Sequence, residues 1–393
     1  LQVVPFGRAF TDGRDTLFYD LAEMRPFIQE ALAFSKKPDV HIWMNRFPPQ
    51  HLEGYEHLIQ DPYKLNDEVR GRKEEYARLL DEGQWLDCRE PARCKYCYLE
   101  RLCDTLETTI ATVDERRFDV VRVDAAWEAK QPPVYGGDPA SARRSKEEAL
   151  RGGQGGQNGK RGLPLFEAKR PVPGSLEAVV HASQATTLHV CAPDVAKAME
   201  QVARFPKLTS VDLELESYGG LAEALAGPLK GRTVGRVTAT TAAQATALLA
   251  IDAPFEVDVV LTRETAAWVN ALPEVPSRVA LRQPNYERLT EAAANDVELR
   301  PFFADLPRHV PVENVPPCIL GREPRKPRAT LDTAMMTPDG RLEIFRYTRR
   351  YILEGYRTKS LRCVSCVHFD ACDGMHVNYV RAHGYGVMEP VGG

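Results

Sequence analysis

The sequence predicts an α/β fold in which a six-unit parallel βα array carries small cysteine-ligated metal-binding extensions. Two observations lead to this. Short β-rich runs alternate with helical patterns between residues 187 and 313. In addition, seven of the nine cysteines fall in two short windows, and scattered core cysteines are not distributed in that way.

The array itself is predicted as six strands separated mostly by single helices. The strands are expected at Thr187–Cys191, Thr209–Leu215, Thr233–Thr238, Glu256–Leu261, Ser277–Leu281 and His309–Glu313. The helices are expected at Ala192–Arg204, Leu221–Leu229, Ala242–Leu249 and Asn285–Ala294. Strands joined in this way form a parallel sheet with right-handed crossovers. The spacing fits both an open doubly wound sheet and a partial barrel.

A stretch rich in Gly, Gln and charge, residues 136–164, is predicted to be a flexible linker because it has almost no large apolar residue. It separates residues 1–135 from a βα domain at 165–315 and a second cysteine module at 316–393. The first part shows a helix at Thr16–Ala33, a strand at Asp39–Trp43, a charged helix around Asp67–Glu82 and the first cysteine module. It resembles the end of an upstream barrel-like domain. A further strand is expected at Leu1–Pro5, and the non-Met start suggests that more chain precedes it.

The composition is that of a globular protein: of 393 residues, 43% are hydrophobic and 27% charged, with a net charge of −4. Acidic and basic residues are mixed along the chain, which disfavours nucleic-acid and lipid partners. No apolar run of about 18 residues and no signal peptide is visible, so a cytoplasmic protein without membrane contact is expected.

The two cysteine windows repeat one pattern, Arg-Cys-x2-Cys-x5-Cys-Asp. It holds Cys94, Cys97 and Cys103 in the first module and Cys363, Cys366 and Cys372 in the second. A Pro-Pro pair lies at nearly the same distance upstream of each, at Pro48-Pro49 and Pro316-Pro317, after an Asn. The agreement suggests a duplicated unit.

Each module can reach four thiolates, through Cys88 in the first and Cys318 in the second. Four cysteines are the usual complement of a 4Fe-4S cluster. Zinc is the alternative, because C-x2-C pairs also build four-cysteine zinc sites, although zinc sites usually pair two such units. The arginines Arg93, Arg101 and Arg362 could offset the negative charge of a thiolate-ligated cluster. Cys191, with no cysteine neighbour in sequence, is expected to be an unligated core residue.

Three other features are candidates with a plainer interpretation. Asp212, Glu214 and Glu216 share one face of a strand, which is either a barrel lumen or the less buried side of an edge strand. His376 and His383 follow the second module and are expected to be half-buried or surface residues. The basic run Arg346–Arg350 is expected to be a solvated helix face.

The second cysteine module, with the βα array before it, resembles the auxiliary-cluster region of radical S-adenosylmethionine enzymes of the SPASM and twitch type. In that family a partial (β/α)6 barrel carries the catalytic cluster, and auxiliary 4Fe-4S clusters sit in a C-terminal extension. The resemblance implies two auxiliary clusters. Their ligands would be Cys88, Cys94, Cys97 and Cys103 for one, and Cys318, Cys363, Cys366 and Cys372 for the other. The catalytic C-x3-C-x2-C motif does not occur in this chain, so the array is expected to be a degenerate partial barrel.

On this resemblance the chain would be the C-terminal portion of a radical S-adenosylmethionine-type enzyme whose catalytic motif lies upstream. Its auxiliary clusters would relay electrons or hold a substrate, with a peptide or a small molecule as candidates and a ferredoxin or flavodoxin as electron donor. S-adenosylmethionine would be a cofactor only if the upstream barrel is present. Catalytic residues are not identified. The alternative is a non-catalytic binding module that iron–sulfur or zinc centres staple together.

Overall fold

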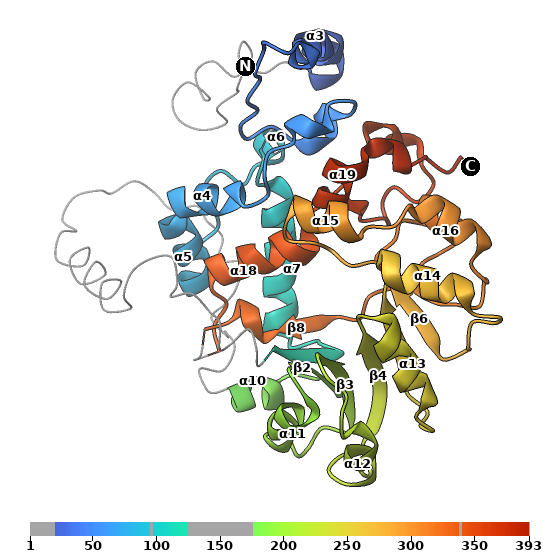
Figure 1. Cartoon of the computed structure of the whole chain (residues 1–393). Helices are drawn as coiled ribbons and strands as arrows, with labels where there is room; N and C mark the ends of the chain where they lie inside the picture. Colours follow the sequence, from blue (N-terminus) through green and yellow to red (C-terminus); the bar gives the residue numbers. More distant parts are fainter. Residues whose placement is uncertain (1–19, 95–96, 125–175, 338–339, 393) are drawn as a thin grey trace, which may run out of the picture.

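The computed structural model describes residues 20–94, 97–124, 176–337 and 340–392 (Figure 1). The linker expected at 136–164 and the strand expected at Leu1–Pro5 lie outside these residues. The main sheet has eight strands. They are β1 (Val120–Asp124), β2 (Thr187–Ala192), β3 (Ser210–Leu215), β4 (Thr233–Ala239), β5 (Glu256–Val260), β6 (Val279–Arg282), β7 (Val312–Glu313) and β8 (Thr330–Asp332).

All eight strands are parallel, which confirms the α/β class. Their order is β7-β6-β5-β4-β3-β2-β1-β8, so the chain moves one strand along the sheet at each step from β1 to β7 and β8 then pairs beside β1. An order without reversal winds in one direction, as in a barrel rather than a doubly wound sheet. The sheet is a curled half-barrel (Figure 1).

The six strands expected between residues 187 and 313 are present as β2 to β7, and two further strands, β1 and β8, join the sheet from outside residues 165–315. Both flank the array on the same side, where β1 pairs with β2 and with β8. β1 belongs to the segment that carries the first cysteine module and β8 to the segment that carries the second, so their hydrogen bonds join both segments to the sheet.

One face of the sheet is apolar and covered by helices, which lie outside the strands in Figure 1. They are α11 (Val195–Ala203), α12 (Leu221–Ala226), α13 (Ala242–Ala250) and α14 (Arg263–Ala271). The next two helices pack on the C-terminal segment instead: α15 (Leu289–Asn295) on α19 (Val377–His383), and α16 (Leu299–Asp305) on α17 (Pro317–Leu320). Three of the helices that cover the sheet begin at a side-chain cap directly after a strand: Asp194, Thr241 and Thr262 accept hydrogen bonds from amides of the first turn. Such caps fix where each strand turns into its helix.

The segment before β1 is helical. It contains α3 (Leu21–Ala33), α4 (Lys64–Gly71), α5 (Lys73–Glu82), α6 (Pro91–Cys94) and α7 (Glu100–Glu115). The strand expected at Asp39–Trp43 is absent, since that segment has no neighbouring strand to pair with. The single charged helix expected around Asp67–Glu82 is two helices that meet at Arg72, whose backbone leaves the helical region.

The segment after β7 returns over the other face of the sheet. It forms α17 (Pro317–Leu320), α18 (Ile344–Arg350), a π-helical turn at Tyr351–Gly355, β9 (Arg357–Thr358), β10 (Met375–His376) and α19 (Val377–His383). β9 and β10 pair antiparallel, and α18 packs against α4 and α5. Within the described residues, no helix is long and apolar enough to cross a membrane.

Candidate metal centres

The four cysteines of the first module converge from three short elements. Cys88 follows α5, Cys94 ends α6, Cys97 lies between α6 and α7, and Cys103 is on the first turns of α7. Burial raises the pKa of Cys97, and the nearby thiolates of Cys88 and Cys94 raise it further. Burial likewise raises the pKa of Cys103 to about 12, with contributions from Cys97 and Cys88. The four thiols therefore lie within electrostatic range of one another.

Two arginines point at the sulfurs of this module. Arg72 Nη1 donates to Cys88 Sγ at 3.0 Å, and Arg89 Nη1 donates to Cys94 Sγ at 3.2 Å. Tyr76 Oη lies 3.3 Å from Cys103 Sγ. The sequence suggested Arg93 and Arg101 for this role, but the side chain of Arg93 is not described and Arg101 donates to the backbone of Arg357. Arg72 was missed because it stands 16 residues before Cys88.

The second module gathers its four cysteines around one pocket. Cys318 on α17 and Cys363, Cys366 and Cys372 all line one small, partly open pocket. Burial raises the pKa of Cys318, and the thiolates of Cys372 and Cys363 add to the rise. Cys318 lies 45 residues before Cys363 in the sequence, and the fold brings the two together.

Backbone amides take the place of arginines at the sulfurs of the second module. Gly374 N donates to Cys372 Sγ at 3.3 Å, and Val391 N donates to Cys366 Sγ at 3.4 Å. Arg362 is held elsewhere, by Glu53 and by two backbone carbonyls, although its charge still lowers the pKa of Cys363 in opposition to burial.

The two modules share a backbone conformation through the repeated pattern. The second cysteine of each donates its amide to the first, Cys97 N to Cys94 O at 2.7 Å and Cys366 N to Cys363 O at 2.9 Å. The amide three residues after the second cysteine returns to that cysteine's carbonyl in both modules. The third cysteine donates to the residue four positions before it, Cys103 N to Leu99 O and Cys372 N to His368 O. After this point the chains diverge, since only the first module continues into a 16-residue helix.

The modules also touch each other. The ring of Tyr98, next to Cys97, packs edge-on against Tyr356 with centroids 6.4 Å apart. Arg101 Nη1 donates to the carbonyl of Arg357 at 3.3 Å. Segments 256 residues apart in sequence are therefore neighbours, and the two cysteine groups belong to one packed unit.

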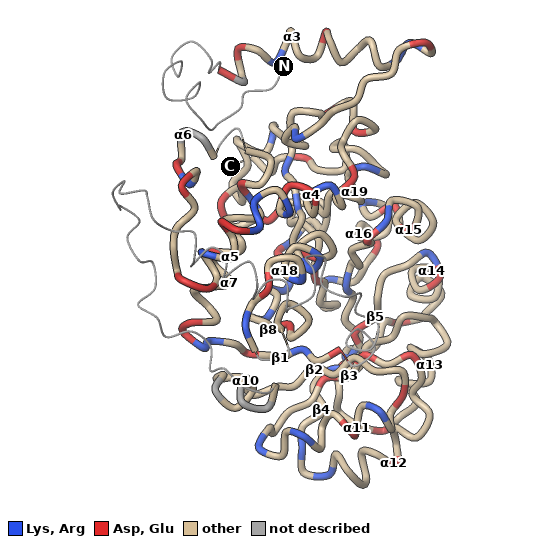
Figure 2. The backbone as a smooth tube through the Cα atoms, turned by 90° about the vertical axis from the view of Figure 1, so that its left-hand side faces the viewer, with Lys and Arg blue, Asp and Glu red and all other residues tan. Residues whose placement is uncertain are grey.

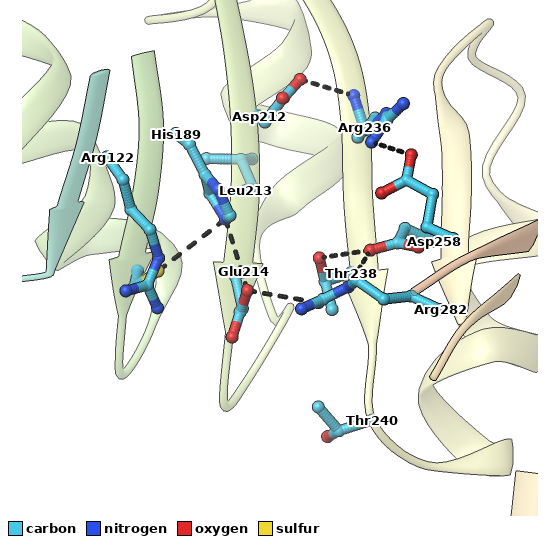
Figure 3. Close-up of polar contacts among 12 residues, drawn as sticks. Arg122, His189, Asp212, Leu213, Glu214, Arg236, Thr238, Thr240, Asp258 and Arg282 are labelled. Atoms are coloured by element: carbon cyan, nitrogen blue, oxygen red, sulfur yellow. Dashed lines mark hydrogen bonds and ion pairs between the residues drawn. The ribbon is translucent and has the colours of Figure 1, made fainter. Parts of the chain in front are cut away.

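The face of the sheet that turns away from the outer helices is polar. Strand register places the polar side chains in rows: Asp332, Arg122, His189 and Asp212 form one row, and Asp124, Cys191, Glu214, Thr238 and Asp258 form the next. Figure 2 shows both signs of charge along these strands, and Figure 3 shows the side chains converging from neighbouring strands. Asp212 and Glu214 lie on a central strand, so the interpretation as an edge strand is wrong.

Ion pairs across strands satisfy most of this face. Arg122 Nη1 on β1 and Arg350 Nη2 at the end of α18 contact Asp332 Oδ2 at 2.9 and 2.7 Å. Although burial opposes it, these two cations lower the pKa of Asp332. Arg282 joins Asp258, at 2.9 Å, to Glu214, at 3.4 Å.

A tight three-residue group lies within the polar face. His189 Nε2 is 3.4 Å from Glu214 Oε2 and 3.8 Å from Cys191 Sγ, and the donor atoms all lie within 4.8 Å of one another. Burial alone would lower the pKa of His189, but the anions of Cys191 and Glu214 raise it to about 10. The interpretation of Cys191 as a core residue missed its polar neighbours. The signal was the His-x-Cys spacing, which places both side chains on one face of a strand.

Two other expectations are corrected. His376 is buried, at 1% exposure, because Nε2 contacts the carbonyl of Ile352 at 2.9 Å and Nδ1 caps α19. His383 is half-buried and lies 3.1 Å from Asp296 Oδ2. The run Arg346–Arg350 is not a solvated face, because Arg350 is buried in its pair with Asp332.

The chain was also compared with known proteins. No protein-family model, no curated protein and no solved structure matches it.

Proposed function

We propose that this chain is the C-terminal portion of a radical S-adenosylmethionine-type enzyme and holds two auxiliary 4Fe-4S clusters. The ligands would be Cys88, Cys94, Cys97 and Cys103 in the first module and Cys318, Cys363, Cys366 and Cys372 in the second. The observation that carries the proposal is the convergence of two four-cysteine groups with the same backbone hydrogen bonds. In the cytosol, clustered thiols of this kind serve metals before disulfides.

The spacing of the cysteines favours a cluster over a single zinc ion. In each module an x2 gap is followed by an x5 gap, whereas four-cysteine zinc sites usually pair two C-x2-C units. When bound, each cluster would supply one-electron chemistry.

The surroundings of the sulfurs fit thiolate-ligated clusters. Hydrogen-bond donors face Cys88 and Cys94 from arginines and face Cys366 and Cys372 from the backbone. Donors of this kind offset the negative charge that a cluster with four thiolates carries. The modules would act as one unit, given the contact between Tyr98 and Tyr356.

The half-barrel supports the assignment to this enzyme class without supplying its catalytic centre. Ion pairs already occupy much of its polar face, and the chain has no C-x3-C-x2-C motif. The catalytic cluster and its S-adenosylmethionine would therefore be held outside this chain. The part proposed for this chain is electron relay or the binding of a substrate, with a peptide as one candidate.

The test is anaerobic reconstitution with iron and sulfide, followed by counting both per chain. We expect about eight iron and eight sulfide per chain, together with broad absorbance at ~400 nm. Replacing Cys94 and Cys97 with Ala, or Cys363 and Cys366 with Ala, should halve both counts. The matched control is Val364→Ala, between two proposed ligands, because the Val364 side chain is 72% exposed and supplies no donor.

The outcomes separate the two hypotheses for this chain. Equal halving by either pair of substitutions supports two independent 4Fe-4S sites. About one zinc per module without a chromophore would refute the redox proposal and leave a zinc-stapled binding module.

A further inference from the structure

We propose that His189, Cys191 and Glu214 form a third metal site, on the polar face of the half-barrel, that binds one zinc-like divalent cation. The site is separate from both cysteine modules, because its three donors come from β2 and β3 of the sheet. It does not depend on the proposed iron–sulfur function.

The donor distances are those of ligands on a tetrahedral ion. With Zn–N of ~2.05 Å, Zn–O of ~2.1 Å and Zn–S of ~2.3 Å, the tetrahedral edges are ~3.4 Å for N···O and ~3.6 Å for N···S. The structure has 3.4 Å between His189 Nε2 and Glu214 Oε2, and 3.8 Å between His189 Nε2 and Cys191 Sγ. Two of the three edges therefore match those of a tetrahedral site to within a few tenths of an ångström, and the third, between Cys191 Sγ and the Glu214 carboxylate, is no longer than 4.8 Å.

The strands impose this arrangement. His189 and Cys191 are two residues apart on β2 and so project from the same face. Glu214 is the register partner of Cys191 on the neighbouring strand β3. A site on two hydrogen-bonded central strands is more rigid than one on loops, and rigid donors favour metal binding. Figure 3 shows His189 and Glu214 pointing toward each other.

The geometry differs from that of a nucleophilic triad. In a triad one imidazole nitrogen faces the nucleophile and the other faces the carboxylate. Here the same nitrogen, Nε2 of His189, faces both Cys191 and Glu214. The Cys191 thiolate and the Glu214 carboxylate offer lone pairs at one point. Nε2 of His189 would add a third on releasing the proton that these two anions hold there, which gives the arrangement a cation requires.

The charges balance around such an ion. The thiolate of Cys191 and the carboxylate of Glu214 supply two negative charges to a divalent cation. Two arginines lie beside the group. Arg122 pairs with Asp332 and also interacts with the charge of Cys191, and Arg282 joins Asp258 to Glu214, which it contacts at 3.4 Å. A bound ion would compete with these two arginines for Cys191 and Glu214.

Three protein ligands leave a fourth position on such an ion. The side chains of His189 and Glu214 are 18% and 29% exposed, so both are half-buried. Three protein ligands and one exchangeable position are characteristic of catalytic rather than structural zinc sites. The fourth position would take water or a substrate oxygen.

The test measures zinc on the full chain by equilibrium dialysis under anaerobic conditions. The variants are His189→Gln and Glu214→Gln, and each should lose one zinc per chain relative to the parent. The matched control is Asp258→Asn, which removes a carboxylate from the same polar face and from the same Arg282 without touching the three donors. It should keep the parent stoichiometry. Thermal melts monitored by circular dichroism check that all four proteins are folded.

A second readout isolates this site from the module thiols. Iodoacetamide alkylation, resolved by peptide mass spectrometry, follows Cys191 separately from the other eight cysteines. Zinc should slow the alkylation of Cys191 at least ~10-fold in the parent and in Asp258→Asn. In Glu214→Gln the protection should be much smaller, because the loss of a ligand weakens zinc binding at least as much as the loss of a residue that supports a ligand. An unchanged zinc count in both glutamine variants, or equal protection of Cys191 in Glu214→Gln, would overturn the proposal.

Discussion

Gly374 is the position at which one added methyl group should damage the second cysteine module most. It follows Cys372 directly before β10, with a φ of +80°. A Cβ at this position would overlap the carbonyl oxygen of Thr358 and lie 2.7 Å from its carbonyl carbon. Both atoms are backbone on the paired strand β9, so no side chain can move aside to relieve the overlap.

The structure offers a matched control for this substitution. Gly321 also has a left-handed backbone, with φ of +72°, but a Cβ there would meet no atom within 4 Å. The left-handed conformation alone costs ~1–2 kcal/mol for a residue with a side chain. We therefore expect Gly321→Ala to destabilise the chain by that amount. With the overlap added, we expect Gly374→Ala to cost more than ~4 kcal/mol, which is exceptional for one substitution.

Urea unfolding of the metal-free variants gives the two free energies, and amide hydrogen exchange at residues 357–376 locates the damage. Because Gly374 N donates to Cys372 Sγ, the same substitution should also reduce reconstituted iron from about eight toward about four per chain. The reasoning fails if the two alanine variants lose equal stability, since the overlap with Thr358 would then contribute nothing.

Two further substitutions test buried charge. Burial lowers the pKa of His376 to about 3, below the ~6.5 of an unfolded chain, so its contribution to stability is complete above pH ~6.5 and falls as the pH drops. Between pH ~6.5 and pH 5 the free energy of unfolding should fall by ~2 kcal/mol on this account. His376→Gln should remove that part of the pH dependence, as measured by urea titrations of both proteins at each pH. If the free energy of unfolding depends on pH equally in both, the expectation is contradicted. Arg350→Met should cost ~3–5 kcal/mol by removing one of the two cations at buried Asp332, while Arg349→Met, one residue earlier and partly exposed, should cost less than ~1 kcal/mol. Thermal melts compare the pair, and similar losses would show that Asp332 does not depend on Arg350.

The sequence was sufficient for the elements whose residues alternate over five or more positions. β2 to β5 were placed to within about two residues because apolar and polar residues alternate along much of their length and caps such as Thr262 follow. β8 was not predicted because its three residues, Thr330–Asp332, are too few to show a periodic pattern. Asp39–Trp43 has the pattern but no strand to pair with, and a strand exists only where a neighbour accepts its hydrogen bonds.

The polar face shows why the rest of the site could not be predicted. Asp212 and Glu214 were visible as a carboxylate stripe, but whether such a stripe is buried depends on its partners. Those partners are Arg328, 116 residues later, and Arg282, 68 residues later. No local pattern specifies pairings at that separation. The cysteine repeat could be recognised because its spacing is a local pattern, whereas Cys318 lies 45 residues before Cys363 and is brought to it by the fold.

The surroundings of the two modules further imply that their proposed clusters would not be equivalent. Cationic arginines donate to two sulfurs of the first module, whereas neutral backbone amides donate in the second. Arg89 also pairs with Asp104 and Glu107, so these two carboxylates offset its positive charge beside Cys94. In the second module the charge of Arg362 acts on Cys363 without a hydrogen bond to its sulfur. The two proposed clusters would therefore differ in the donors that face their sulfurs, and such donors tune the reduction potential of a cluster.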